Sequence, residues 1–215
     1  MRRRRTSQRA RTSRSLELFA ATTLAAALAA AGAAAGSPAA KPRVTVIGDS
    51  VAASLDYVPA ARARLGRGLD LRSEAAACRR LVAESCVFRG TKPDTVLELV
   101  RARGSALGRL VVIDVGYNDW AAVYDVDRVV RTLRASGVRT VVWVTLRETT
   151  ANYAQVNARI RSAARRWKRL VVADWNAASG GHGWFRPDGL HLTPDGAMGL
   201  ARFLRPLVLA ELARS

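Results

Sequence analysis

The feature that most constrains this chain is a series of short, nearly uninterrupted apolar runs that alternate with helical patterns. Four runs rich in Val and Ile lie at 43–47, 110–115, 140–146 and 170–174, and a weaker run spans 69–73. Runs of this length and composition predict strands buried on both faces, which is typical of a parallel sheet covered by helices. The sequence therefore predicts an α/β protein with a mostly five-stranded parallel sheet.

The segments between these runs carry helix signals. Pro59 interrupts one helical stretch, and Pro93 is expected in the first turn of another. The expected helices span 51–65, 91–103, 125–135, 150–167 and 194–212. Neither an internal repeat nor a linker divides this pattern, so residues 41–215 are predicted to form one domain.

Residues 1–40 have a different composition. Seven arginines precede Leu16, and an alanine-rich apolar stretch continues to about Ala35. This order is typical of a secretory signal, with cleavage after Ala35 or after Ala39. The alternative is a retained anchor, which would be the chain's only membrane contact. The segment predicts a secreted or envelope-associated bacterial protein.

The charge of the chain is strongly basic. It has 35 Lys and Arg against 17 Asp and Glu, a net charge of +18, and part of this excess lies in the first 40 residues. No groove-reading module and no interleaving of aromatic with basic residues is present, so nucleic-acid binding is not expected. A basic helix face is either solvated or in contact with an anionic envelope polymer or lipid. Its residues are Arg161, Arg165, Arg166, Lys168 and Arg169.

The two cysteines, Cys78 and Cys86, are eight residues apart. In an oxidising compartment they are expected to form a local disulfide, and two free buried thiols are the alternative. Two cysteines with two histidines are too few for most structural zinc sites. We expect neither a metal nor an organic cofactor.

Three loops that follow predicted strands carry chemically capable side chains. In a parallel sheet the carboxyl ends of the strands meet at one edge, so these loops are expected to face one crevice. The motifs are Gly48-Asp49-Ser50, Gly116-Tyr117-Asn118-Asp119 and Asp188-Gly189-Leu190-His191.

The residue types in these loops suit nucleophilic catalysis. A serine at a strand-to-helix turn lies where backbone N–H groups favour negative charge. The spacing of Asp188 and His191 lets the carboxylate hold one ring nitrogen, which leaves the other free to take a proton from a hydroxyl. Each motif alone also fits a plain helix cap, a turn or a solvated histidine. Their order and placement favour a joint site.

Together these motifs resemble three sequence blocks of the SGNH (GDSL-type) hydrolases, over nearly all of the chain from Arg43 onwards. The resemblance implies a flavodoxin-like three-layer α/β/α fold and ester hydrolysis. It implies Ser50 as the nucleophile, His191 as the general base and Asp188 as the residue that orients it. Asn118 would donate its side-chain amide to the oxyanion, together with the backbone N–H of Ser50.

One block departs from the family pattern. Where the family has a glycine whose N–H completes the oxyanion hole, residues 75–80 read Ala-Ala-Ala-Cys-Arg-Arg. The N–H of Cys78 or of Arg79 is expected to replace it, and we assign Arg79 because the block resembles SGNH domains associated with membrane acyltransferases. A disulfide to Cys86 would hold this loop in place. The alternative is an incomplete hole.

Aromatic side chains lie beside the catalytic loops. Trp120, Tyr124 and Trp184 are expected to line a substrate pocket, and simple packing is the alternative. The sequence thus predicts a monomeric, exported serine esterase for short-chain acyl esters, such as O-acetyl groups on carbohydrate. Acyl transfer to a sugar hydroxyl with the same triad, or a catalytically silent domain that binds an anionic polymer, are the alternatives.

Overall fold

A computed structural model of the chain describes residues 40–214. Its centre is a five-stranded, all-parallel sheet with the order β2-β1-β3-β4-β5. The strands are β1 (Arg43–Gly48), β2 (Asp70–Ala75), β3 (Leu110–Asp114), β4 (Thr140–Val144) and β5 (Leu170–Ala173). All five runs predicted from the sequence form strands, which confirms the α/β fold.

The apolar runs form strands because both of their faces are covered. Every residue of β3 and β4 is buried. Across the middle of the sheet Ile47 lies opposite Ile113, which in turn lies opposite Trp143, and all three side chains are fully buried. In β2, at the edge, most residues are only half-buried, which explains its weaker sequence signal.

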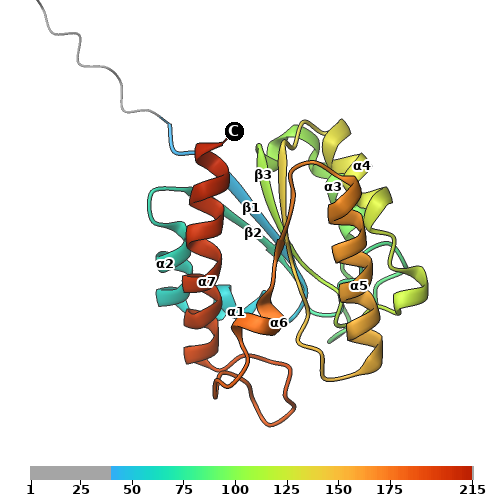
Figure 1. Cartoon of the computed structure of the whole chain (residues 1–215), viewed down its shortest axis with the longest axis vertical. Helices are drawn as coiled ribbons and strands as arrows, with labels where there is room; N and C mark the ends of the chain where they lie inside the picture. Colours follow the sequence, from blue (N-terminus) through green and yellow to red (C-terminus); the bar gives the residue numbers. More distant parts are fainter. Residues whose placement is uncertain (1–39, 215) are drawn as a thin grey trace, which may run out of the picture. The chain divides into compact units, whose positions relative to one another are not determined.

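Two helical layers enclose the sheet (Figure 1). The helices α1, α2, α6 and α7 cover one face, and α3, α4 and α5 cover the other. Their bounds are α1 (Ser54–Tyr57), α2 (Pro59–Gly66), α3 (Val96–Arg103), α4 (Val126–Ala135), α5 (Ala151–Arg166), α6 (Trp175–Ala178) and α7 (Pro194–Ala213). Two short 3₁₀ helices, η1 (Gly104–Leu107) and η2 (Ala121–Val123), complete the pattern.

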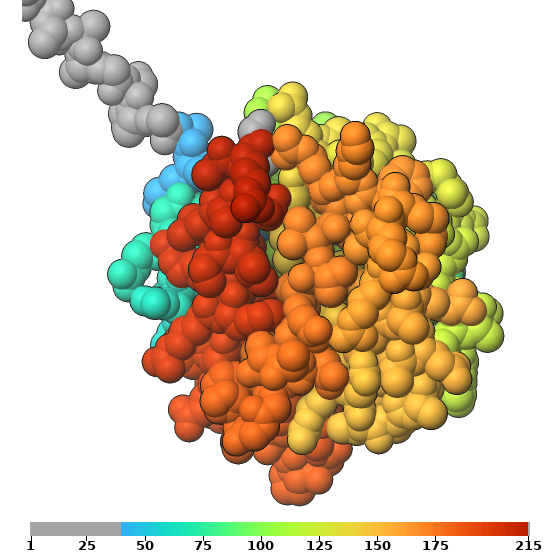
Figure 2. All heavy atoms as spheres, in the orientation of Figure 1, coloured from blue at the N-terminus to red at the C-terminus, as the bar shows by residue number. Residues whose placement is uncertain are grey.

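The start of α7 is packed tightly against the loop that precedes it. A Cβ atom at Gly196 would lie 2.1 Å from the backbone oxygen of Trp184, and one at Gly199 would lie 2.9 Å from the Trp184 ring. Glycine is therefore needed at both positions. In Figure 2 α7 and α5 form much of the visible surface, with the segment around β5 and α6 between them.

Two predicted helices begin at other residues than expected. The stretch predicted over 51–65 is divided, because the short α1 ends at Tyr57 and Pro59 opens α2. The helix predicted from residue 91 starts at Val96. Thr95 caps it: its hydroxyl accepts from the N–H of Glu98 (3.1 Å), and the Glu98 carboxylate accepts from the N–H of Thr95 (2.9 Å).

The predicted export segment, residues 1–40, lies outside the described residues apart from Ala40. Within residues 40–214, no helix is both long enough and apolar enough to cross a bilayer.

Candidate active site

Ser50 lies in a tight turn directly after β1. The turn closes when the N–H of Ala53 donates to the carbonyl of Asp49 (3.1 Å). Gly48 permits the close return of the chain, because a Cβ atom there would lie 2.1 Å from the Cβ of Ala52. The end of a strand and a sharp turn thus place the Ser50 hydroxyl at the carboxyl edge of the sheet.

Asp49 joins this turn to the loop after β3. One carboxylate oxygen accepts from the N–H of Val51 (3.0 Å), and the other accepts from the N–H groups of Gly116 (3.2 Å) and Tyr117 (3.1 Å). Complete burial raises the pKa of Asp49 to about 6, against the lowering effect of these N–H groups. Asp49 therefore holds the turn after β1 and the loop after β3 together. The sequence did not predict this role.

Asp188 and His191 are held by one compact turn. The N–H of Gly189 donates to the carbonyl of Arg186 (2.8 Å), and one oxygen of Asp188 accepts from the N–H groups of Leu190 (2.8 Å) and His191 (2.9 Å). The second oxygen of Asp188 lies 2.8 Å from His191 Nδ1. The turn therefore fixes the orientation of the imidazole.

The other ring nitrogen of His191 faces the serine. His191 Nε2 lies 3.0 Å from Ser50 Oγ, which completes a continuous Ser50–His191–Asp188 arrangement. The N–H of Leu190, followed by the His191 side chain, lowers the pKa of Asp188 to about 2, so the carboxylate stays charged beside the ring. The side chains of His191 and Asp188 are 40% and 48% exposed, so water reaches both.

The structure corrects the predicted third oxyanion donor. The N–H of Arg79 already donates to the carbonyl of Ala76 (3.2 Å), which excludes it. Cys78 instead has φ of 67°, the left-handed conformation that usually needs glycine, and it forms a disulfide with Cys86. Within residues 40–214 the N–H groups of Cys78 and Ser50 donate to no other atom. By its conformation and its free N–H, Cys78 is therefore a better candidate than Arg79 for the place of the missing glycine.

The Arg79 side chain has a structural position instead. It is only 5% exposed, and its guanidinium donates to the carbonyls of Gly48 (3.2 Å) and Asp94. Burial lowers its pKa. Arg79 thus ties the end of β1 to the segment before α3, and it does not point to a substrate.

Asn118 comes from the loop after β3 and meets the loop that carries Cys78. Its side-chain Nδ2 donates one proton to the carbonyl of Arg79 (3.3 Å), which leaves the second proton of the amide for another acceptor. The Arg80 guanidinium holds the Asn118 carbonyl (2.7 Å). Next to it, burial raises the pKa of Asp119 to about 7, although the N–H of Leu81 donates to this carboxyl.

A pocket of about 370 Å³ opens beside Ser50 and His191, with Ala77 and Leu192 in its wall. None of the three aromatic residues predicted for it, Trp120, Tyr124 and Trp184, lines this pocket. That prediction was wrong.

Packing explains where these aromatic side chains lie. The buried Tyr124 hydroxyl donates to the carbonyl of Val115 (2.5 Å) and accepts from Trp143 Nε1 (3.1 Å). Trp184 stacks on Trp175, with ring centroids 5.5 Å apart, and packs on the start of α7. Trp120 is 67% exposed at the start of η2.

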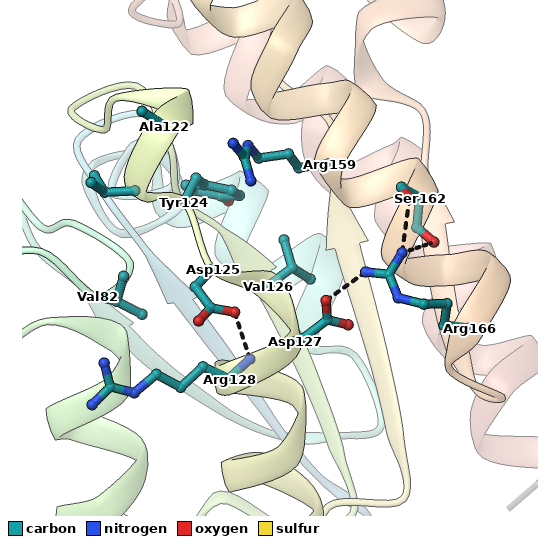
Figure 3. A pocket seen from close by; sticks show the side chains of 11 residues that line it. Val82, Ala122, Tyr124, Asp125, Val126, Asp127, Arg128, Arg159, Ser162 and Arg166 are labelled. Atoms are coloured by element: carbon teal, nitrogen blue, oxygen red, sulfur yellow. Dashed lines mark hydrogen bonds and ion pairs between the residues drawn. The ribbon is translucent and has the colours of Figure 1, made fainter.

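A larger hollow of about 640 Å³ lies between η2, α4 and α5 (Figure 3). Most of its charged groups are already paired. Arg166 contacts Asp127 (2.5 Å) and Ser162 (2.8 Å), and Asp125 caps α4 by accepting from the N–H of Arg128 (2.9 Å). None of the three residues Ser50, Asp188 and His191 lines it, so the smaller pocket is the candidate active site.

Two of the five side chains of the predicted basic face are paired with carboxylates. Arg161 forms ion pairs with Glu148 (3.3 Å) and Asp174 (3.1 Å), and Arg166 is paired as described. The Arg169 guanidinium donates to the backbone carbonyl of Arg214 (3.1 Å). Within residues 40–214 the side chains of Arg165, Lys168 and Arg169 form no ion pair, so polyanion binding to this face stays a prediction.

Residues 40–214 contain no group of three or more His, Cys, Asp or Glu side chains that could hold a metal ion. In sequence, no protein-family model and no curated protein matches the chain.

Solved structures share its fold. A carbohydrate acetylesterase family member from Sinorhizobium meliloti superposes with a TM-score of 0.62 at 18% identity, over 80% of this chain and 99% of its own. A protein from Bacteroides fragilis assigned as an acylhydrolase gives 0.59 at 18%, over 80% and 91%. A psychrotrophic esterase from Pseudoalteromonas sp. gives 0.53 at 12%, over 80% and 99%. The chain therefore shares the α/β fold of these proteins, a parallel sheet between two helical layers, as its sequence predicts.

Proposed function

We propose that this protein is an exported serine esterase that hydrolyses short-chain acyl esters. The observation that carries this proposal is the relay of contacts from Asp188 through His191 to Ser50, with distances of 2.8 Å and 3.0 Å. An unaided serine hydroxyl is a poor nucleophile at neutral pH, and an oriented imidazole removes that barrier by accepting its proton. The fold neighbours, whose names describe esterases and an acylhydrolase, support the same reaction class.

The geometry suggests the following course. Ser50 Oγ attacks the ester carbonyl while His191 Nε2 takes its proton, and Asp188 stabilises the imidazolium that forms. Backbone N–H groups of Ser50 and Cys78, with the free amide proton of Asn118, hold the oxyanion. His191 then protonates the departing alcohol, which leaves an acyl group on Ser50. A water molecule that gives its proton to His191 releases the acid and restores the serine.

The open site favours hydrolysis over acyl transfer. Transfer to a sugar hydroxyl requires that water be excluded from the acyl-enzyme, whereas the His191 and Asp188 side chains here are 40% and 48% exposed. The pocket of about 370 Å³ beside Ser50 has room for a short acyl group together with part of the alcohol.

Export is the second part of the proposal. The arginine-rich start followed by an alanine-rich stretch supports it, as does the disulfide, because such bonds persist mainly outside the cytoplasm. The acyl group is proposed to be acetyl on a carbohydrate.

The test is hydrolysis of p-nitrophenyl acetate, butyrate and octanoate by the mature protein, Ser50→Ala and His191→Ala. We expect both variants to lose at least about 10³-fold in kcat, and the rate to fall with acyl length. Ser105→Ala, an exposed serine on η1, and His182→Ala, the other histidine of the chain, are the matched controls and should keep activity. Equal background rates in all proteins would refute the proposal and favour a silent binding domain.

A further inference from the structure

The rim of the Ser50 pocket combines aromatic and cationic side chains. Tyr57 and Phe88 line it although they are 76% and 49% exposed, an unusual position for large apolar rings. Arg89 and Arg186 also line it. The pocket lining contains no acidic residue, so the two positive charges are not balanced there.

The loop that carries Phe88 and Arg89 is preformed. The backbone groups of Phe88 and Thr91 exchange two hydrogen bonds, of 2.9 Å and 3.0 Å, around a two-residue turn. Arg89 and Gly90 in this turn have φ of 49° and 76°, as a tight hairpin turn of this kind requires. The disulfide at Cys86 anchors the loop two residues earlier. A rigid loop presents its side chains at a low entropic cost of binding.

Arg186 belongs to the turn that holds the catalytic histidine. Its N–H donates to the carbonyl of His191 (2.7 Å), and its carbonyl accepts from the N–H of Gly189 (2.8 Å), so its backbone is fixed. Within residues 40–214 neither the Arg186 guanidinium nor that of Arg89 forms an ion pair, and Arg89 lies over the Phe88 ring at 5.2 Å. Both charged groups are thus available to a ligand.

Ser54 adds an unsatisfied hydroxyl to the same pocket. Ser54 is the first residue of α1, four positions after Ser50. It lines the pocket and is only 7% exposed. Its Oγ is buried, and in residues 40–214 it has no hydrogen-bond partner. A buried hydroxyl without a partner is costly, and a polar ligand atom in the pocket would satisfy it.

We propose that the pocket selects esters whose alcohol part is an acidic sugar. The sugar ring stacks on Tyr57 and Phe88, and its negative group binds Arg89 and Arg186. Ser54 forms a hydrogen bond with a hydroxyl or with the ester. This inference rests on the proposed esterase function and names its substrate class. An uncharged sugar would use the rings but leave both guanidinium groups without a partner, which is why the charge is part of the proposal.

The test measures binding without turnover. Calorimetry compares two probes, a mono-O-acetyl methyl glucuronoside and the corresponding mono-O-acetyl methyl glucoside, which differ only in the carboxylate. The protein is Ser50→Ala, which cannot consume either probe. We expect the glucuronoside to bind roughly tenfold more tightly at low salt, and this preference to shrink at high salt because the charges are exposed.

Variants then assign the preference to residues. Arg89→Gln with Arg186→Gln, in the Ser50→Ala background, should remove the preference, so that both probes bind with equal affinity. Arg101→Gln, which removes an exposed arginine on α3 outside the pocket, should keep it. Equal affinity for both probes, or a preference that survives the loss of both arginines, would overturn the inference. A failure of the esterase function would appear separately, as a lack of Ser50-dependent turnover of p-nitrophenyl acetate.

Discussion

Cys78 offers a sharp test of how the oxyanion hole is built. Its φ is 67°, and within residues 40–214 its N–H donates to no other atom, which is why we propose it as an oxyanion donor. Two double variants isolate this backbone conformation: Cys78→Gly with Cys86→Ala, and Cys78→Ala with Cys86→Ala. Both lack the disulfide, and both therefore lose the same stability, about 2–3 kcal/mol for a loop of this length.

The two variants differ in the cost of the left-handed conformation. Glycine adopts it freely, whereas alanine pays about 1–2 kcal/mol, which is a factor of about 5–30 in the population that keeps the donor in place. The upper limit is the loss of one whole oxyanion donor, about 10²–10³ in kcat. We therefore expect the Gly variant to exceed the Ala variant by about 5–30-fold in kcat.

The assay is steady-state hydrolysis of p-nitrophenyl acetate, at a temperature at which circular dichroism shows that both variants are folded. KM should change little, because the donor acts on the transition state. Equal kcat values for the two folded variants would refute the argument, since the N–H at position 78 would then contribute nothing to the reaction.

Three further predictions follow from the site. Asp188→Asn should lower kcat by about 10²–10⁴ because the amide favours the wrong tautomer of the imidazole, and a rate like the parent's would contradict this. Gly48→Ala should cost about 1–3 kcal/mol of stability and reduce activity, because the new methyl meets Ala52; an unchanged Tm and rate would oppose it. Burial raises the pKa of Asp119 from 3.8 to about 7, so between these pH values the folded protein retains a proton that the unfolded chain releases. The free energy of unfolding therefore declines as pH rises through this range, by at most about 1.4 kcal/mol for each unit of pKa difference. Asp119→Asn should flatten that decline in urea unfolding, whereas an unaltered slope would count against it.

The sheet and the contacts of His191 with Ser50 and Asp188 were predictable because both depend on local signals. Buried strands require continuous apolar runs, and the loops at their carboxyl ends necessarily lie at one edge. Ser50 and Asn118 each directly follow a predicted strand. The spacing of Asp188 and His191 is that of a single turn, so the geometry of the pair is set within four residues.

The third oxyanion donor could not be read in the same way. The residues themselves do not show whether the N–H of Cys78 or that of Arg79 is the donor, because no glycine indicates a position with positive φ. The choice is made by tertiary contacts: the disulfide to Cys86 fixes one residue, and the turn to Ala76 uses the N–H of the other. Backbone conformation at a non-glycine residue is here a property of the fold.

The pocket lining was missed for a related reason. The sequence does not indicate whether an aromatic side chain near a catalytic loop points to the pocket or to the core. Tyr124 points to the core, where its hydroxyl donates to the carbonyl of Val115. The real rim did carry a signal. It was a weak one: Gly90 marks a turn between Phe88 and Thr91, but Arg-Gly is not one of the dipeptides that predict a two-residue hairpin.

The central claim, that His191 activates Ser50 as a nucleophile, is tested most directly by covalent labelling. The protein is treated with a fluorophosphonate probe, and the modified peptide is located by mass spectrometry. We expect a single adduct on Ser50, formed much more slowly in His191→Ala and at the parent's rate in His182→Ala. An adduct on another serine, or labelling of Ser50 that does not depend on His191, would contradict it.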